Sequence, residues 1–536
     1  MVGPLLLAAL CLLLPWPRLA RWLALLGAAW TTYVGGLLLA SFAAVPGADF
    51  RFVEEHPWSA AFGAAFTFGV DGIGALLLLL SGLITAIATI AAFQQERHAR
   101  SYHALVLVLL AAMNGVFTAL DLLLFFVCWE AVLLPMLPLV GVFGGEQRRY
   151  AALKFFVYTL AGSVLMLATV LALWNAQQPN GRDVVVPPAI VAAHGVTDSD
   201  GGPLLVHGLP VTTNLGAPTV HVPRGFDLRH LALQADTFTR TPFLGTTLAA
   251  FGFLAVLLAC LVKIPAVPLH TWLPHAHVQA PTAVSVLLAG VLLKLGVYGL
   301  YRVGVPLFPA AASQWAGTLG GLGVAGILWG AWAALGQSDL KRLVAYSSVS
   351  HMGFCLLGLF SGTAAGVNGG MVQAFTHGLS SSLLFLVVGV VYDRAHHRRV
   401  DGFGGLQRPM PVFGWILLLA ALAGAGLPAL AGFPGEFLVL AGAFTGGGAF
   451  PWLAAGAALS VVLSAAYLLW TVKRVVYGPL RHAEQAQFPD CTPRELAATL
   501  PLVALLVVFG LWPRPLVDAL RPACELLVWQ LHGGTP

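Results

Sequence analysis

Apolar segments long enough to cross a bilayer, about 20 residues each, recur along almost the whole sequence, separated by short charged or Pro/Gly-rich turns. Hydrophobic residues fill 58% of the 536 positions and charged residues only 9%, a composition typical of helical membrane proteins. The sequence therefore predicts an all-α polytopic membrane protein. Fourteen spans are expected, at residues 2–16, 24–43, 70–92, 104–120, 122–142, 153–174, 243–275, 282–302, 315–335, 343–361, 367–392, 411–444, 451–477 and 497–512.

Charge in the turns predicts the orientation. Residues 2–16 lack the positive region and cleavage site of a signal peptide, so we expect a retained first helix. Of the 27 Lys and Arg residues, seventeen fall in turns on one side, eight on the other and two inside spans. Because cytoplasmic loops carry the excess of Lys and Arg, the first side is predicted to be cytoplasmic and both termini to lie outside.

Two spans are interrupted next to an ionisable residue. Pro265 and Pro268 follow Lys263, while Pro428, Gly432, Pro434 and Gly435 precede Glu436. Proline removes a backbone donor and clashes with the preceding turn, so each helix must break there. Interrupted helices in corresponding positions of two halves are typical of transport sites.

These breaks predict two inverted five-helix repeats. Residues 104–302 form helices 4–8, including an insertion at 175–242, and residues 303–477 form helices 9–13. Residues 1–103 contribute helices 1–3, and residues 478–536 contribute helix 14 and a tail. The odd number of spans per repeat inverts one repeat relative to the other.

Glu130 is the expected partner of Lys263. A charged residue deep in an apolar span costs roughly 2.5–3.5 kcal/mol and is a functional-site hypothesis by default. The pair could be structural, holding two helices together. It could also be a switch, because a buried lysine keeps its proton while a carboxylate is close and tends to release it when the carboxylate moves away.

Further titratable residues follow the pair along the chain. Lys294 lies deep in the next span, and His351 and His377 are flanked by hydroxyl side chains. Together with Lys263 and Glu436 they predict a titratable line along the membrane midplane. Each member can gain or lose a proton without a metal or an organic cofactor, although a single histidine in an apolar helix is often only a hydrogen-bonding residue.

The insertion at 175–242 is predicted to form short strands and turns on the outer surface. Its histidines, His194, His207, His221 and His230, match no standard metal spacing. The six cysteines show no metal or disulfide pattern, and no basic run resembles a nucleic-acid site.

Four segments resemble one known family: WEAVLLPMLPLVGVFGGEQRRYAALKFFVYTLAGSVLML, VKIPAVPLHTWLPHAHVQAPTAVSVLLAGVLLKLGVYG, SDLKRLVAYSSVSHMGF and GFPGEF. They are similar to the antiporter-like membrane subunits of respiratory complex I and the related Mrp-type cation/proton antiporters. The resemblance is strongest to the NuoM type, the counterpart of NADH dehydrogenase chain 4. Glu436 favours this type, because the other types usually carry lysine there.

The resemblance implies roles for particular residues. Glu130 would pair with Lys263, and Lys294 would be the central residue of the buried line. His351 and His377 would be the connecting histidines, and Glu436 would be the terminal residue towards the next subunit. It also implies a subunit of NADH:quinone oxidoreductase in a bacterial cytoplasmic membrane, among other membrane subunits that include neighbouring antiporter-like ones.

No cofactor is expected in this chain. It has no Rossmann fingerprint and no iron–sulfur cysteine cluster, so FMN, iron–sulfur clusters and quinone are expected in partner subunits. Two positions depart from the family: His275 and Gln279 stand where WLPDAHVEAP has acids. An Mrp-type antiporter subunit, and a non-transporting assembly scaffold whose buried charges only fix packing, are the alternatives.

Overall fold

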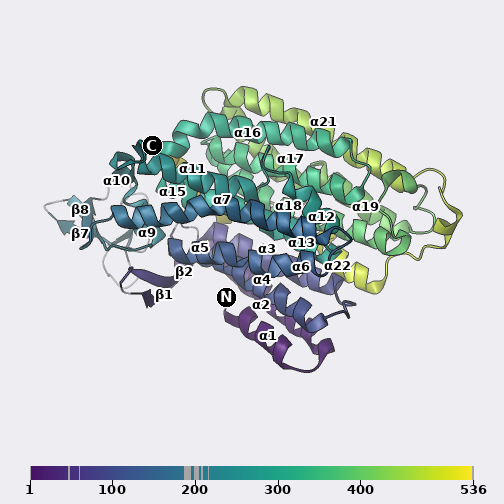
Figure 1. Cartoon of the computed structure of the whole chain (residues 1–536). Helices are drawn as coiled ribbons and strands as arrows, with labels where there is room; N and C mark the ends of the chain where they lie inside the picture. The colour runs from purple at the N-terminus through teal and green to yellow at the C-terminus, as the bar shows by residue number, and fades with distance from the viewer. Residues whose placement is uncertain are drawn as a thin grey trace.

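The computed structural model describes residues 2–45, 47, 49–59, 61–185, 195–197, 204–206, 209–214 and 217–533. Figure 1 shows a bundle of long helices running side by side, with short strands gathered at one end. The longer helices are α1 (Val2–Leu13), α2 (Pro17–Ala44), α3 (Gly72–Ala91), α4 (Ala99–Thr118), α5 (Leu122–Ala131), α6 (Leu133–Gly141), α7 (Arg148–Ala176), α11 (Leu248–Lys263), α12 (Trp272–Gln279), α16 (Pro309–Leu335), α17 (Leu340–Phe360), α18 (Ala364–Ala395), α19 (Pro411–Gly424), α20 (Gly432–Thr445), α21 (Phe450–Val475), α22 (Pro493–Leu511) and α23 (Arg514–Leu531).

One span is built from five consecutive pieces. These pieces are α13 (Thr282–Leu287), the π-helix η1 (Leu288–Leu292), α14 (Leu293–Gly299), the π-helix η2 (Leu300–Gly304) and α15 (Val305–Leu307). The remaining short helices are α9 (Leu228–Ala232), α10 (Ala235–Arg240), η3 (Val400–Gly402) and η4 (Ala483–Gln487).

The predicted all-α membrane fold is confirmed. Within the described residues, eleven helices are long and apolar enough to cross a membrane. The other three predicted spans correspond to α1 and to two spans that are each split into a pair of helices, α11 with α12 and α19 with α20. Small residues allow close packing: a Cβ on Gly35 of α2 would lie 2.5 Å from the Leu79 nitrogen of α3.

Both predicted breaks are present. The chain leaves helical geometry between Lys263 and Trp272, and again between Gly424 and Gly432. The first broken span begins at the strand-bearing end of the bundle and the second begins at the opposite end, so they run antiparallel (Figure 1). This is the arrangement that inverted repeats require.

The strand-bearing end contains the predicted insertion and a hairpin that the sequence did not predict. In the insertion, β3 (Arg182–Val185), β8 (Ala217–Val222) and β7 (Thr212–Asn214) form one antiparallel sheet, and β4 (Gly195–Thr197), β5 (Leu204–Val206) and β6 (Leu209–Pro210) form another. The unpredicted hairpin pairs β1 (Arg51–Ser59) with β2 (Ala64–Val70). A two-residue pair, β9 (Pro242–Phe243) and β10 (Thr246–Thr247), precedes α11.

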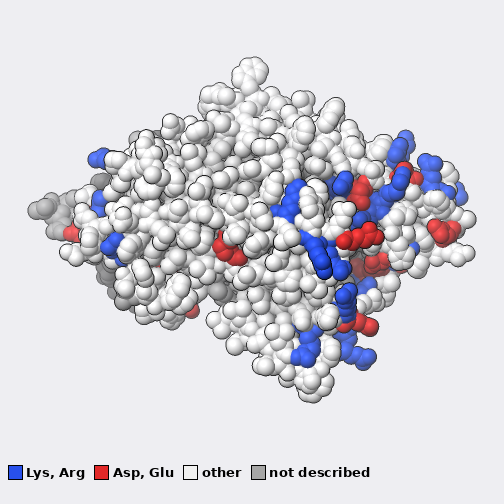
Figure 2. All heavy atoms as spheres, in the orientation of Figure 1, with Lys and Arg blue, Asp and Glu red and all other residues white. Residues whose placement is uncertain are grey.

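Positive charge gathers at the opposite end. On the face drawn in Figure 2, most Lys and Arg side chains lie at the right of the view, with few near the strands. Figure 1 places α12, α19 and α22 at that end. We call it the basic end.

Two helices differ from expectation. The α1 helix ends at Leu13 and contains 12 residues, so at 1.5 Å per residue it is about 18 Å long, shorter than the roughly 30 Å thickness of the hydrocarbon core. The α23 helix was not predicted, because its polar and apolar residues alternate around the helix and leave no continuous apolar run.

Candidate functional site: a buried line of titratable side chains

Lys263 is the last residue of α11, and its side chain is 5% exposed. Its Nζ donates a hydrogen bond to the Trp129 carbonyl oxygen at 2.9 Å and lies 3.7 Å from the centre of the Trp129 ring. Trp129 belongs to the last turn of α5, where carbonyls lack intrahelical partners. The cation site therefore lies between two interrupted helices: the end of α11 supplies the lysine, and the end of α5 supplies the carbonyl oxygen.

The expected ion pair between Lys263 and Glu130 is not formed in this structure, and that expectation is corrected here. Among the described residues no ion pair involves either side chain, and Glu130 Oε1 is buried without a hydrogen-bond partner.

Lys294 lies at the centre of the buried line and is 0% exposed. It follows the π-helix η1, and its Nζ donates to the carbonyl of Ala289, five residues earlier. The same Nζ lies 2.8 Å from His377 Nδ1 on α18. A π-helical turn is wider than an α-helical turn and is frequent at functional sites, and here its carbonyl binds the lysine.

The two histidines are neighbours. The ring centres of His377 and His351 lie 5.4 Å apart. Nδ1 of His377 faces Lys294, while its Nε2 is buried with no hydrogen-bond partner in the described part of the chain. The ring therefore has one nitrogen at which it can receive a proton and a second from which it can release one.

His351 reaches Glu436 directly. His351 Nδ1 lies 3.2 Å from Glu436 Oε1, and both side chains are buried. The Nε2 of Gln373 lies 3.2 Å from the same histidine nitrogen and donates to Glu436 Oε1 at 3.4 Å. The three polar atoms form a triangle. The amide can donate to His351 when the proton is on Glu436, and to Glu436 when the proton is on His351.

The second broken helix positions Glu436. It is the fifth residue of α20, and the preceding break passes close to its carboxylate. A Cβ on Gly426, whose φ is +69°, would lie 2.3 Å from Glu436 Oε2. Glycine suits this position for two reasons: it adopts the left-handed backbone conformation without strain, and it has no Cβ to collide with the carboxylate.

Of the six predicted site residues, the structure joins four: Lys294, His377, His351 and Glu436. Lys263 and Glu130 form a separate group around Trp129, and no hydrogen bond or ion pair in the described residues connects it to Lys294.

Sequence reasoning missed several participants. Gln373 lies one helical turn before His377, a spacing that could have revealed it, because residues four apart share a helix face. His277 stacks on Phe385 with ring centres 4.3 Å apart, and neither of its ring nitrogens has a partner. Lys341 is buried and donates to the Ala280 carbonyl at 2.7 Å.

A polar cavity of about 660 Å³ opens at the basic end beside Lys341. Its wall includes Asp339, Asp393, His397 and Arg398. Burial lowers the pKa of His397, which lies in the α18–α19 connection, and repulsion by His482 lowers it further.

His275 and Gln279, the two departures from the family pattern, both make hydrogen-bond contacts at the basic end. His275 Nδ1 lies 2.9 Å from the Thr271 carbonyl oxygen and 3.4 Å from Lys154 Nζ. Gln279 Oε1 accepts from the backbone nitrogen of Gln147 at 3.0 Å. Gln279 thus ties α12 to the start of α7 through uncharged bonds.

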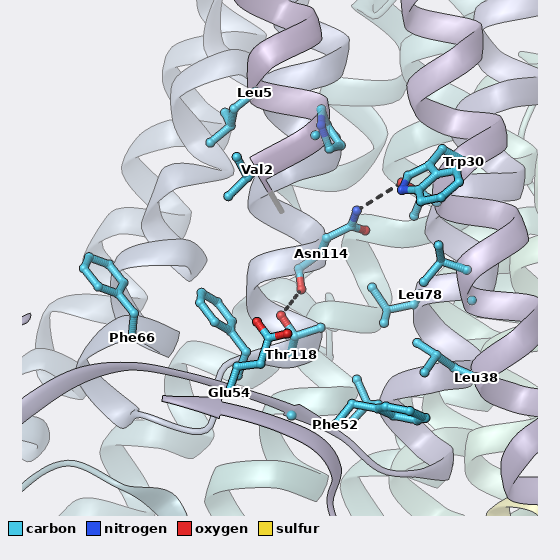
Figure 3. A pocket seen from close by; sticks show the side chains of 18 of the residues that line it. Val2, Leu5, Trp30, Leu38, Phe52, Glu54, Phe66, Leu78, Asn114 and Thr118 are labelled. Carbon is cyan, nitrogen blue, oxygen red and sulfur yellow. Dashed lines mark hydrogen bonds between the residues drawn. The ribbon is translucent and has the colours of Figure 1, made fainter. Parts of the chain in front are cut away.

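An apolar cavity of about 610 Å³ lies apart from this line (Figure 3). Val2, Trp30, Leu38, Phe52 and Phe66 point into it from α1, α2 and the hairpin. In its wall the Asn114 amide donates to Thr31, and Asn114 accepts from Ser81, so this polar side chain is already satisfied.

The insertion histidines form no metal site in the described residues, where no group of three or more His, Cys, Asp or Glu could hold an ion. His221 lies 2.8 Å from Asp183 on the exposed sheet. Burial lowers the pKa of His230. His194 and His207 lie outside the described residues.

The antiparallel broken helices and the buried titratable line define a polytopic membrane protein of the antiporter-like class. The family signature described as NADH:quinone oxidoreductase/Mrp antiporter, TM, matches residues 119–185 and 226–463. The unmatched interval lies within the predicted insertion. The chain belongs to this family.

Individual relatives agree with the predicted M-type resemblance. NADH-quinone oxidoreductase subunit M of Rhodobacter capsulatus is 39% identical, over 96% of this chain and 91% of the relative. NAD(P)H-quinone oxidoreductase chain 4 1 of Synechococcus sp. (strain JA-3-3Ab) is 36% identical, over 99% and 93%. A chain of respiratory complex I from Thermus thermophilus with bound NADH superposes with a TM-score of 0.79 at 30% identity, over 99% of this chain and 98% of that one.

Proposed function

We propose that this chain is a proton-translocating membrane subunit of a type I NADH:quinone oxidoreductase. The observation that carries the proposal is the contact series from Lys294 through His377 and His351 to Glu436, in which each member is buried and can hold a proton. Names and similarity of the relatives support the same function.

Proton transfer along the line follows from its atoms. The Lys294 ammonium gives a proton to His377 Nδ1, and the amine stays anchored on the Ala289 carbonyl. The imidazole releases a proton from Nε2, which has no hydrogen-bond partner in the described residues, towards the neighbouring His351 ring, whose centre lies 5.4 Å away, and His351 Nδ1 passes one to Glu436 Oε1. Gln373 stabilises either location of the last proton, because its amide can donate to whichever atom lacks one.

Lys263 and Glu130 supply the regulated step. In the observed state the lysine is held by Trp129, and Glu130 Oε1 has no hydrogen-bond partner within the described residues. When the α5–α6 break moves, Glu130 takes over the ammonium and changes how readily Lys263 holds its proton. A neighbouring subunit drives that movement, since this chain carries no redox centre of its own.

The assembly follows from the family. Neighbouring antiporter-like subunits flank the chain in a bacterial cytoplasmic membrane. FMN, iron–sulfur clusters and quinone belong to partner subunits. The basic end faces the cytoplasm and both termini lie outside, in agreement with the distribution of Lys and Arg.

The test is to tag the chain, purify it gently from its native membrane and assay what accompanies it. Flavin, iron–sulfur subunits and NADH:quinone activity in the purified material would support the proposal. Recovery of membrane subunits alone, with no redox cofactor, would refute it and favour the Mrp-type alternative, with His275 and Gln279 the first residues to change.

A further inference from the structure

A second cavity at the basic end lies between the α1–α2 corner and the α3–α4 loop. Its volume is about 420 Å³. Trp16, Arg18 and Arg21 line it from the corner, Phe93 and Glu96 line it from the loop, and His103 lines it from α4. No member of the proposed proton path contributes to it.

Two helix N-termini face this cavity. Trp16 and Pro17 begin α2, and Ala99 begins α4. Neither helix has a side-chain cap or an acidic residue in its first turn. Both dipoles therefore present their positive ends, equivalent to about half an elementary charge each, towards the cavity.

Two guanidinium groups add to this field. Arg21 is anchored, because its Nη1 donates to the Phe93 carbonyl at 2.8 Å, while its Nε is buried with no partner. Arg18 is exposed and makes no hydrogen bond or ion pair in the described residues. The carboxylate of Glu96, which is exposed, is the opposing charge in the wall.

His103 is the observation that points to a ligand. It is 1% exposed, it lines the cavity, and neither ring nitrogen has a hydrogen-bond partner among the residues that the structure describes. A buried polar group without a partner costs about 1–3 kcal/mol, and a hydrogen-bond acceptor in the cavity would remove that cost. The donors around the cavity (His103, both arginines and two helix N-termini) all suit an anion with several oxygens.

The surroundings of the cavity indicate where the anion comes from. Leu13, Trp16, Trp22 and Leu26 are all more than half exposed on the same two helices, which places apolar surface and interfacial tryptophans beside the cavity. An amphiphile can bury its acyl chains along this surface while its charged group enters the cavity, whereas a free anion gains nothing from it.

We propose that this cavity binds the phosphate of an anionic phospholipid from the membrane leaflet at the basic end. Arg18 and Arg21 pair with the phosphate oxygens, and His103 donates one hydrogen bond. The lipid thereby seals the α1–α2 corner against α4, to which Arg100 already ties it through the Cys11 and Leu12 carbonyls.

The test uses the whole purified complex, stripped of loosely bound lipid and titrated with phosphatidylglycerol or phosphatidylcholine, with bound lipids counted by native mass spectrometry. Each arginine near a charged membrane surface contributes about 1 kcal/mol, so we expect phosphatidylglycerol to bind roughly fivefold more weakly to Arg18→Gln and about thirtyfold more weakly to Arg18→Glu. His103→Phe keeps a ring but removes both nitrogens, and should also weaken binding in a normally assembled complex.

Arg97→Gln is the matched control, since Arg97 is exposed at the same end but does not line the cavity. Equal retention of phosphatidylglycerol by the wild type and Arg18→Glu would overturn the proposal, as would equal binding of phosphatidylcholine. Displacement of the lipid by millimolar inorganic phosphate would also overturn it, because the cavity would then be a site for free anions.

Discussion

Replacing Glu436 with glutamine separates proton transfer from helix packing. Glutamine has the same shape, and its amide oxygen can still accept from His351, so Glu436→Gln keeps the contact but cannot take the proton. The structural cost is the difference between a charge-assisted and a neutral hydrogen bond, about 1 kcal/mol. Assembly should therefore survive.

The cost to proton transfer is larger. At the observed 3.2 Å, a carboxylate attracts a protonated His351 by about 5 kcal/mol at an effective dielectric constant of ~20. Each 1.4 kcal/mol of added barrier slows a step about tenfold. If loss of the carboxylate raises the barrier by only a third of this attraction, transfer through His351 still slows by more than tenfold.

The assay is NADH-driven proton uptake by the complex reconstituted in vesicles, expressed per NADH oxidised. NADH oxidation by an artificial electron acceptor requires no proton transfer through the membrane and reports the redox part of the complex, so its co-purification with the tagged chain measures intact assembly. We expect Glu436→Gln to retain the second activity and lose at least tenfold in coupled turnover. Glu484→Gln, at an exposed carboxylate in the basic-end loop, should match the wild type. Full coupled pumping by Glu436→Gln would refute the role of the carboxylate.

Three further predictions concern the same line. Lys294→Arg keeps the charge but cannot release a proton, so pumping should be abolished; normal pumping in the assembled variant would mean that only the charge matters. Gln373→Leu removes the amide beside His351 and Glu436 and should slow coupled turnover about tenfold without abolishing it, since a hydrogen bond to a charged group is worth roughly 1.5–3 kcal/mol. Gly426→Ala should displace the Glu436 carboxylate and lower the thermal unfolding temperature as well as pumping, and unchanged values in both measurements would contradict the packing argument.

The sequence predicted most of the membrane architecture, because apolar length and proline position act locally. All fourteen spans have counterparts, and the breaks after Lys263 and before Glu436 fall where the prolines placed them. The unpredicted elements are those in which this signal is weak. The β1–β2 hairpin contains charged residues and a proline, and α23 is amphipathic and short of the apolar content of a span.

The candidate site was predicted as a set of residues but not as a set of contacts. Lys294, His351, His377 and Glu436 attracted attention because ionisable groups in apolar spans are costly. Gln373 carries no charge and gave no such signal, although its amide bridges two of them. The choice of Trp129 over Glu130 as partner of Lys263 depends on the rotation of α5 about its axis, which sequence spacing alone does not determine.

The separation of Lys263 from the main line bears on how such a chain avoids leaking protons. A permanently connected line from Lys263 to Glu436 would conduct passively. In the observed state, Lys263 is instead bound to the Trp129 carbonyl and ring, and Lys294 is bound to Ala289 and His377. Both lysines are thus held by backbone carbonyls at helix irregularities, and connecting them requires movement of a break. In the proposed mechanism, gating needs only a shift of α5 after which Glu130 instead of Trp129 contacts Lys263. The two are adjacent residues on one short helix.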